Sequence, residues 1–132
     1  MVKLMPVIID LIRRPDSFKV MSTVNADGCP HTIVCGSLVV PNEETLAVGR
    51  VWAKTTGQNL VRDRRAEFLV SEGKTAYSIV TELVDRSEDP EIVKKINIYL
   101  ERMGMTTESV WLFTVKAVYD ESISENTGKQ VL

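Results

Sequence analysis

The sequence predicts a mainly β domain of the α+β class, with about six strands in an antiparallel sheet and about three short helices. The strand segments follow one another through short turn sequences, which is the pattern of antiparallel hairpins rather than of parallel crossovers. A sheet of so few strands leaves unpaired edges, so we expect it to close into a small barrel. The length of 132 residues fits one domain spanning residues 1–132, and 44% hydrophobic residues are enough to fill its core.

The first half of the chain predicts one helix and three strands. Residues 4–12 indicate a short amphipathic helix that ends before Pro15. Residues 18–24 alternate apolar and polar side chains, and Gly28 supplies positive φ in the turn that follows. Residues 31–40 are apolar and β-branched, which predicts one long second strand paired with the first. A turn at residues 41–44 then leads to a third strand over residues 45–50.

A short helix and a second hairpin are predicted next. Thr55 and Gln58 have the spacing of a capping box, so the helix is expected to start at Thr55 and to end near Arg65. Residues 66–71 and 75–84 are expected to form the fourth and fifth strands, joined by a tight turn at residues 72–74.

The last third of the chain predicts a helix and a final strand. Asp89 or Ser87 can cap the helix, Pro90 suits its first turn, and Gly104 suits the position after its end. The final strand is predicted over residues 110–118 and is followed by a polar tail. Alternation places these residues on one face of that strand: Trp111, Phe113, Val115, Ala117 and Tyr119.

The charge pattern argues against a nucleic-acid partner. The formal net charge is −2, whereas binding to phosphate backbones needs a concentrated basic surface. The short basic cluster of Arg62, Arg64 and Arg65 is interleaved with Asp63 and Glu67, which is typical of a solvated helix end.

The two cysteines and the N-terminus predict a reducing compartment. Cys29 and Cys35 fall within or beside one predicted strand, too far apart for a disulfide between them. The apolar stretch near the N-terminus is broken by Pro6 and Asp10, so it lacks the pattern of a signal peptide. No segment approaches the length of a membrane span, and the expected location is the cytoplasm, with no membrane partner.

Lys54, Thr55 and Thr56 form the first candidate site. They open a predicted helix, whose N-terminus offers unpaired N–H groups and partial positive charge. Arg50 lies just upstream, and Gly57 allows a ligand to approach the first turn closely. These features together are suited to one phosphate group. The plainer interpretation is that Thr55 only caps the helix and Lys54 is only solvated.

The second candidate site is the run Val34, Cys35, Gly36 and Ser37, where small and weakly polar residues interrupt a bulky strand. A glycine inside a strand often marks close approach by a ligand, or else a bulge or tight sheet crossing, and both interpretations stay open.

Other reactive residues offer less. His31 has no second histidine with which to bind a metal, and it is expected to be an exposed strand-end residue. Cys35 has no visible base beside it, so a buried, inert thiol is expected. Trp52 and Trp111 are expected to pack in the core or in an interface. No catalytic triad, carboxylate pair or dinucleotide glycine motif is present.

The order of these pieces resembles a known family. An Asp-Gly turn, a Pro-His strand start, a further strand and then Lys54-Thr55-Thr56 with Asn59 and Leu60 opening a helix occur in succession over residues 22–70. This succession is similar to that of the pyridoxamine 5′-phosphate oxidase-like family of split barrels that bind flavin mononucleotide (FMN). The resemblance implies a six-stranded split barrel of Greek-key type, paired as a homodimer with FMN at the interface.

The resemblance also implies roles for individual residues. Lys54, Thr55 and Thr56 are expected to hold the FMN phosphate, with Asn59 close by. The path of the ribityl chain would be lined by Val48, Gly49 and Arg50. The flavin ring would be flanked by Val34, Cys35, Gly36 and Ser37. The partner chain would cover the ring with Trp111, Val131 and Leu132. The phosphate-binding set is thinner than in relatives that oxidise pyridoxamine phosphate, and the chain ends soon after its last strand, which argues against that reaction.

The leading hypothesis is therefore an FMN-binding flavoprotein that acts as an oxidoreductase or electron carrier, with a small-molecule or protein redox partner still to be identified. A flavin performs its own redox chemistry, so the chain needs no acid–base pair of its own. The alternatives are a non-catalytic module that binds a flavin, a deazaflavin or haem, and a barrel that binds single-stranded nucleic acid. Scarce aromatics and the acidic balance disfavour the last of these.

Overall fold

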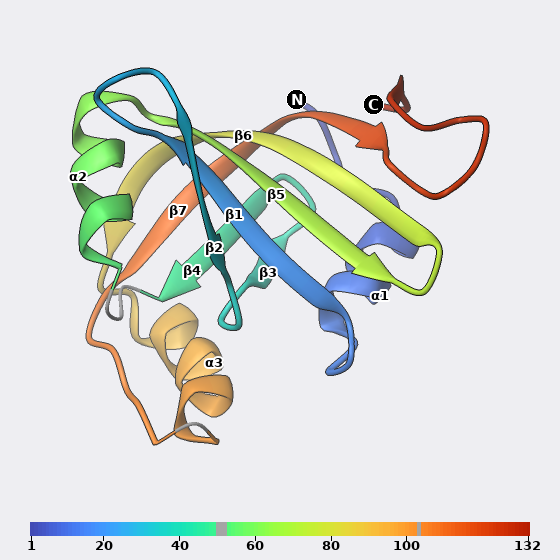
Figure 1. Ribbon diagram of the computed structural model, residues 1–132. Helices are drawn as coiled ribbons and strands as arrows, with labels where there is room; N and C mark the ends of the chain where they lie inside the picture. The colour runs from blue at the N-terminus through green and yellow to red at the C-terminus, as the bar shows by residue number, and fades with distance from the viewer. Residues whose placement is uncertain (50–52, 103) are drawn as a thin grey trace.

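The computed structural model describes residues 1–49, 53–102 and 104–132 of the chain. Figure 1 shows a curved sheet with helices at its margins. The elements in chain order are α1 (Pro6–Arg13), β1 (Phe18–Val24), β2 (Pro30–Val34), β3 (Val39–Asn42), β4 (Thr45–Gly49), α2 (Lys54–Arg62), β5 (Arg65–Glu72), β6 (Thr75–Ser87), α3 (Pro90–Glu101), β7 (Val110–Asp120) and β8 (Lys129–Gln130).

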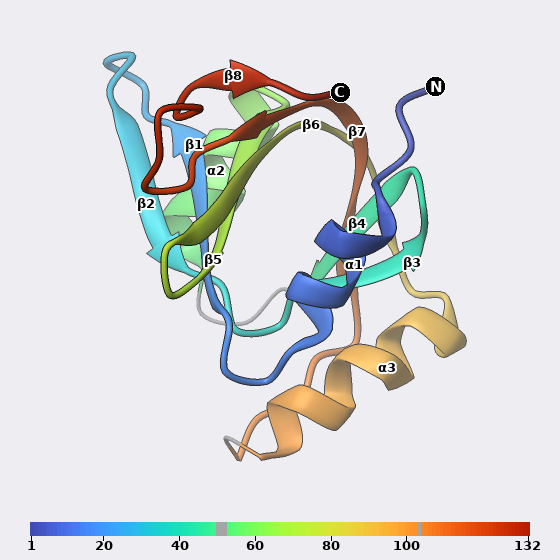
Figure 2. The ribbon, with the colours of Figure 1, turned by 90° about the vertical axis from the view of Figure 1, so that its right-hand side faces the viewer.

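The strands form one antiparallel sheet in the order β2-β1-β5-β6-β7-β4-β3, with β8 paired to β7. Strands β2 and β3 are consecutive in the chain but lie at opposite ends of this order. Only residues 35–38 join them, a link that spans at most about 18 Å. The sheet must therefore curl until its two ends approach each other, and Figure 2 shows this curvature. The predicted antiparallel, barrel-like α+β fold is confirmed.

The inside of the curved sheet holds the main core. Phe68 of β5 and Phe113 of β7 meet edge to face, with ring centroids 5.2 Å apart, and neither side chain reaches solvent. Helix α1 adds Ile8, Leu11 and Ile12 to the same cluster, because its apolar residues recur on one face. Figure 2 shows α1 lying against the open side of the curved sheet.

Helix α3 covers the outer side of β3 and β4 with a second, smaller apolar cluster. Ile96 and Leu100 of the helix pack there with Val39, Ala47 and Val110. The predicted caps of this helix are confirmed: the Asp89 carboxylate accepts a hydrogen bond from the Glu91 N–H at 2.9 Å, and Gly104 follows the helix with φ of 72°.

Two local predictions in the first half of the chain were wrong. The single strand predicted over residues 31–40 is two strands, β2 and β3, because residues 35–38 cross from one end of the sheet to the other. The predicted capping box is absent as well. Helix α2 already begins at Lys54, so Thr55 lies inside the helix, and the N-cap residue is Ala53, which has no side chain to accept a hydrogen bond.

Strand β7 does not keep the predicted alternation to its end. Val80 of β6 pairs with Ala117, whereas its neighbour Thr81 pairs with Val115, so β7 carries one extra residue at this point. The bulge moves the buried position from Ala117 to Val118. The polar tail also contains a strand that was not predicted, β8, which pairs with the end of β7.

Both cysteines are free thiols, Cys29 exposed and Cys35 buried. Over the described ranges, no helix is long and apolar enough to cross a membrane.

Candidate functional site

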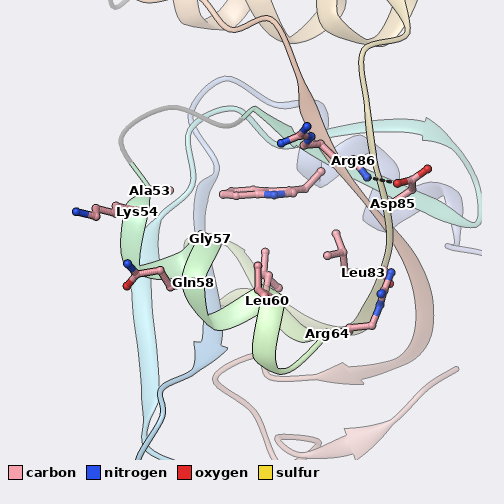
Figure 3. Close-up of a pocket in the computed structure, with 11 residues that line it drawn as sticks. Ala53, Lys54, Gly57, Gln58, Leu60, Arg64, Leu83, Asp85 and Arg86 are labelled. Atoms are coloured by element: carbon pink, nitrogen blue, oxygen red, sulfur yellow. Dashed lines mark hydrogen bonds between the residues drawn. The ribbon is translucent and has the colours of Figure 1, made fainter.

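A hollow of about 790 Å³ lies between α2, the end of β6 and the start of β7, and we call it the α2 hollow. Its volume is within the range of about 300–1,000 Å³ found for small-molecule sites. Figure 3 shows Lys54 and Gln58 on α2 across the hollow from Asp85 and Arg86 on β6.

One wall of the α2 hollow is apolar and partly flat. Trp111 at the start of β7 contributes its indole, and Leu60 and Leu83 line the hollow from α2 and β6. A Cβ atom added at Gly57 would lie 3.5 Å from Cζ2 of Trp111, so the indole lies against the first turns of α2. Trp111 is 6% exposed and belongs to the main core cluster, so only a small part of the indole is open to a ligand.

The polar side chains of the α2 hollow are mainly cationic. Its lining residues include three cations, Lys54, Arg64 and Arg86, and one carboxylate, Asp85. The Arg64 guanidinium is fixed against β6, since it donates to the backbone oxygens of Leu83 at 3.0 Å and of Val84 at 2.9 Å. Within the described residues, Lys54 and Arg86 take part in no ion pair. The hollow therefore favours an anionic group.

A second hollow, of about 250 Å³, lies beside the crossing segment 35–38, and we call it the split hollow. Ala53 and Trp111 line both this hollow and the α2 hollow. The structure thus gathers around this one hollow most of the residues expected to flank the flavin ring and its side chain: Val34, Cys35, Gly36, Ser37, Val48, Gly49 and Trp111.

The side chains of Ser37 and Cys35 in the split hollow are already engaged or inert. Ser37 Oγ accepts a hydrogen bond from the Gly49 N–H at 3.2 Å. Burial raises the pKa of the Cys35 thiol to about 12, so the thiol stays protonated near neutral pH and is a poor nucleophile. This hollow therefore offers an apolar surface rather than reactive groups.

The residues expected to hold a phosphate do not converge on one point. Lys54 lines the α2 hollow, whereas Thr55 lines a separate hollow of about 390 Å³ with Asn25 and Arg62. Thr56 is buried. Arg50 and Trp52 lie outside the described residues. Of the described members of this set, Lys54 alone lines the same hollow as Trp111.

Asn59 lines the same hollow as Thr55, and its side chain is engaged within the protein. Its buried side-chain amide donates to Thr23 Oγ1 and to Asn25 Oδ1, each at 3.0 Å, and its oxygen accepts from Arg62 at 2.8 Å. These bonds join α2 to β1 and to the turn after it. Asn59 therefore positions the helix, and its amide is already satisfied by the protein itself.

Sequence reasoning missed Arg64, Leu83, Asp85 and Arg86 as lining residues. The register of β6 against β7 shifts between Leu83 and Asp85, and this irregularity brings Arg86 opposite Trp111 across the two strands. Only the pairing of the two strands reveals this neighbourhood, so no signal in the sequence pointed to Arg86. A metal centre has no support among the residues that the structure describes, which contain no group of three or more metal-ligating side chains.

Comparison with known proteins places the fold. No protein-family model matches the chain, and no curated protein sequence matches it significantly. Among solved structures, an FMN-binding protein from Syntrophomonas wolfei subsp. wolfei has a TM-score of 0.75 and 17% identity, with 89% of this chain and 85% of that chain covered.

Two further solved structures are similar. An F420 reductase has a TM-score of 0.65 and 16% identity, with 83% of this chain and 93% of the other covered. A proposed pyridoxamine 5′-phosphate oxidase from Lactobacillus delbrueckii has a TM-score of 0.71 and 20% identity, with 90% and 95% covered. The chain therefore has the fold of the pyridoxamine 5′-phosphate oxidase-like, FMN-binding split barrels, as its sequence indicated.

Proposed function

We propose that this chain is an FMN-binding flavoprotein that acts as an oxidoreductase or electron carrier. The observation that carries this proposal is that Trp111 lines two hollows of different character, and we infer that they meet there. On one side lies the apolar split hollow, and on the other lies the cationic α2 hollow. A planar ring joined to an anionic group has the chemistry that such a junction accommodates.

The charges of the α2 hollow match a phosphate monoester. Lys54, Arg64 and Arg86 against Asp85 leave two uncompensated positive charges among the lining residues. A phosphate monoester carries about −1.5 to −2 near neutral pH, and guanidinium groups bind it with directed, charge-assisted hydrogen bonds. Lys54 also stands at the N-terminus of α2, where the helix dipole favours the same sign of ligand.

The residues of the chain then have positioning roles. Trp111 and the apolar lining of the split hollow would hold and shield the ring, and the cations would fix the phosphate. FMN, when bound, supplies the redox chemistry, while the protein supplies orientation and electrostatics. The inert state of the Cys35 thiol agrees with this division, because a reactive thiol beside a flavin would add unwanted chemistry.

The proposal includes a homodimer that covers the two hollows. Val61 on α2 and Val84 on β6 are 88% and 54% exposed, and Val34 near the split hollow is 68% exposed. Large exposed apolar residues around an open hollow favour burial against a partner surface. A second copy of the chain would enclose the cofactor, and light scattering is expected to give twice the chain mass of 14.8 kDa.

A second candidate is a deazaflavin as the cofactor, since one protein of the same fold is an F420 reductase. A deazaflavin, like FMN, would place a planar ring and a phosphate in the two hollows. Absorption spectra separate the two cofactors, and a protein that retains a deazaflavin but releases FMN would favour this second reading.

The test is a titration of the cofactor-free protein with FMN, in which binding is measured by the quenching of flavin fluorescence. Arg86→Ala and Lys54→Ala are each expected to weaken binding about tenfold or more, because each removes one charge-assisted contact. Lys116→Ala, on the exposed bulge of β7, is the matched control and should bind as the native chain does. Equal affinities in all four proteins would exclude the α2 hollow as the phosphate site.

A further inference from the structure

A fourth hollow, of about 300 Å³, lies between the end of α1 and the side of α3, above β3, and we call it the α1–α3 hollow. Its floor is apolar and consists of Ile12 together with Leu38, Val39 and Val40. It shares no lining residue with the α2 hollow or with the split hollow. The cofactor proposed above therefore does not account for it.

The two helices create this hollow through their periodicity. Ile96 and Leu100 of α3 pack on β3 and β4, which leaves Lys95, Ile98 and Arg102 on the neighbouring face. On α1, Ile12 is buried and the next residue, Arg13, is exposed at the rim. Ile98 is 52% exposed although it borders an apolar floor, so apolar surface is available there to a ligand.

The rim of the α1–α3 hollow has a single sign of charge. Arg13, Lys95 and Arg102 line it, and its lining residues include no carboxylate. Arg13 and Lys95 form no ion pair within the described ranges. Cations that surround an apolar floor produce a positive potential in a partly desolvated place, where it attracts anions most strongly.

We propose that the α1–α3 hollow binds a small amphipathic anion, in which a carboxylate or phosphate head group meets the cations and a short apolar chain lies on the β3 floor. The volume is at the lower end of small-molecule sites, which fits one short chain better than a folded partner. This site is independent of the proposed flavin site, and the two can be occupied together.

The test titrates decanoate and decyl phosphate into the full chain by calorimetry, below their micelle concentrations. Binding of either probe at one site is expected, and uncharged decanol should bind at least fivefold more weakly. For the anionic probe that binds, Lys95→Ala is expected to weaken binding about threefold to fivefold, which is the size of effect expected for one partly exposed ion pair. Lys94→Ala is the matched control, since Lys94 neighbours Lys95 on α3 but does not line the hollow.

Three results would overturn the proposal: no binding of either probe, equal binding of decanol, or equal loss in Lys94→Ala and Lys95→Ala. Retention on anionic vesicles without binding of the free probes would also contradict it, and would instead identify a membrane-facing surface. FMN affinity, measured in Lys95→Ala, should be unchanged, so failure of either site can be recognised separately.

Discussion

The buried side-chain amide of Asn59 contributes to the stability of the fold. Its hydrogen bonds to Thr23, Asn25 and Arg62 fasten α2 to β1. We expect Asn59→Ala to lower the free energy of unfolding by about 2–3 kcal/mol, because it leaves buried polar partners unsatisfied. Urea unfolding of the cofactor-free protein measures this, and Gln58→Ala, an exposed amide on the same helix, should change stability by less than about 0.5 kcal/mol. Equal effects of the two substitutions would contradict the structural role of Asn59.

Cys35 makes stability depend on pH above neutrality. Burial raises its pKa in the folded state from the ordinary value of 9.0 to about 12. Above pH 9 the unfolded chain loses the thiol proton while the folded chain keeps it. The contribution of the protonated Cys35 thiol to the free energy of unfolding is therefore fully present below pH 9 and is lost as pH rises toward 12. Between about pH 9 and pH 10.5 the free energy of unfolding of the native chain is expected to fall by about 1.5 kcal/mol more than that of the Cys35→Ala variant.

The control for this prediction is Cys29→Ala, which removes the exposed thiol. Its stability should fall with pH in parallel with that of the native chain, as measured by urea unfolding at each pH. A Cys35→Ala variant with the same pH dependence as the native chain would show that the buried thiol does not cause the loss.

The packing of α3 against β4 depends on Gly49. A Cβ atom at this position would lie 2.9 Å from Cγ2 of Ile96 and 3.3 Å from Cδ1 of Leu100. Because the branched Ile96 side chain cannot yield easily, Gly49→Ala is expected to destabilise the protein by about 1–3 kcal/mol. Gly57→Ala is the matched control on α2, where the added Cβ has only ordinary contacts and helix propensity gains up to about 1 kcal/mol.

A double-mutant cycle distinguishes a clash from a general effect on the strand. Adding Ile96→Ala removes Cγ2, so Gly49→Ala should cost less in that background than in the native chain. Strictly additive losses of unfolding free energy would mean that the contact with Ile96 is not the cause.

At the scale of elements, periodicity and turn residues predicted most of the structure. Strand β1 and the caps of α3 were placed correctly, because alternation, Asp89, Pro90 and Gly104 act locally. The predictions failed where contacts between residues far apart in the chain determine the local structure. Residues 35–38 were assigned to a strand interior, with a tight sheet crossing left open as one interpretation of Gly36, and the closure of the sheet makes them a crossing. The bulge in β7 is likewise fixed by its pairing with β6.

At the scale of the whole molecule, closure of the sheet creates the candidate site. It brings Val34 of β2 and Ser37 of the crossing segment beside Trp111 of β7, residues far apart in the chain. The sequence pointed to most of the split hollow and to Lys54. It could not point to Arg86, whose position opposite Trp111 depends on a register shift, or to the burial of Thr56 and Asn59 inside the fold.

The measurement that tests the central claim most directly is the visible absorption spectrum of the protein after incubation with FMN and desalting. We predict a flavin spectrum that survives desalting at about one FMN per chain. A colourless protein after desalting, from a chain that remains folded by circular dichroism, would contradict the claim that the two hollows lined by Trp111 form an FMN site.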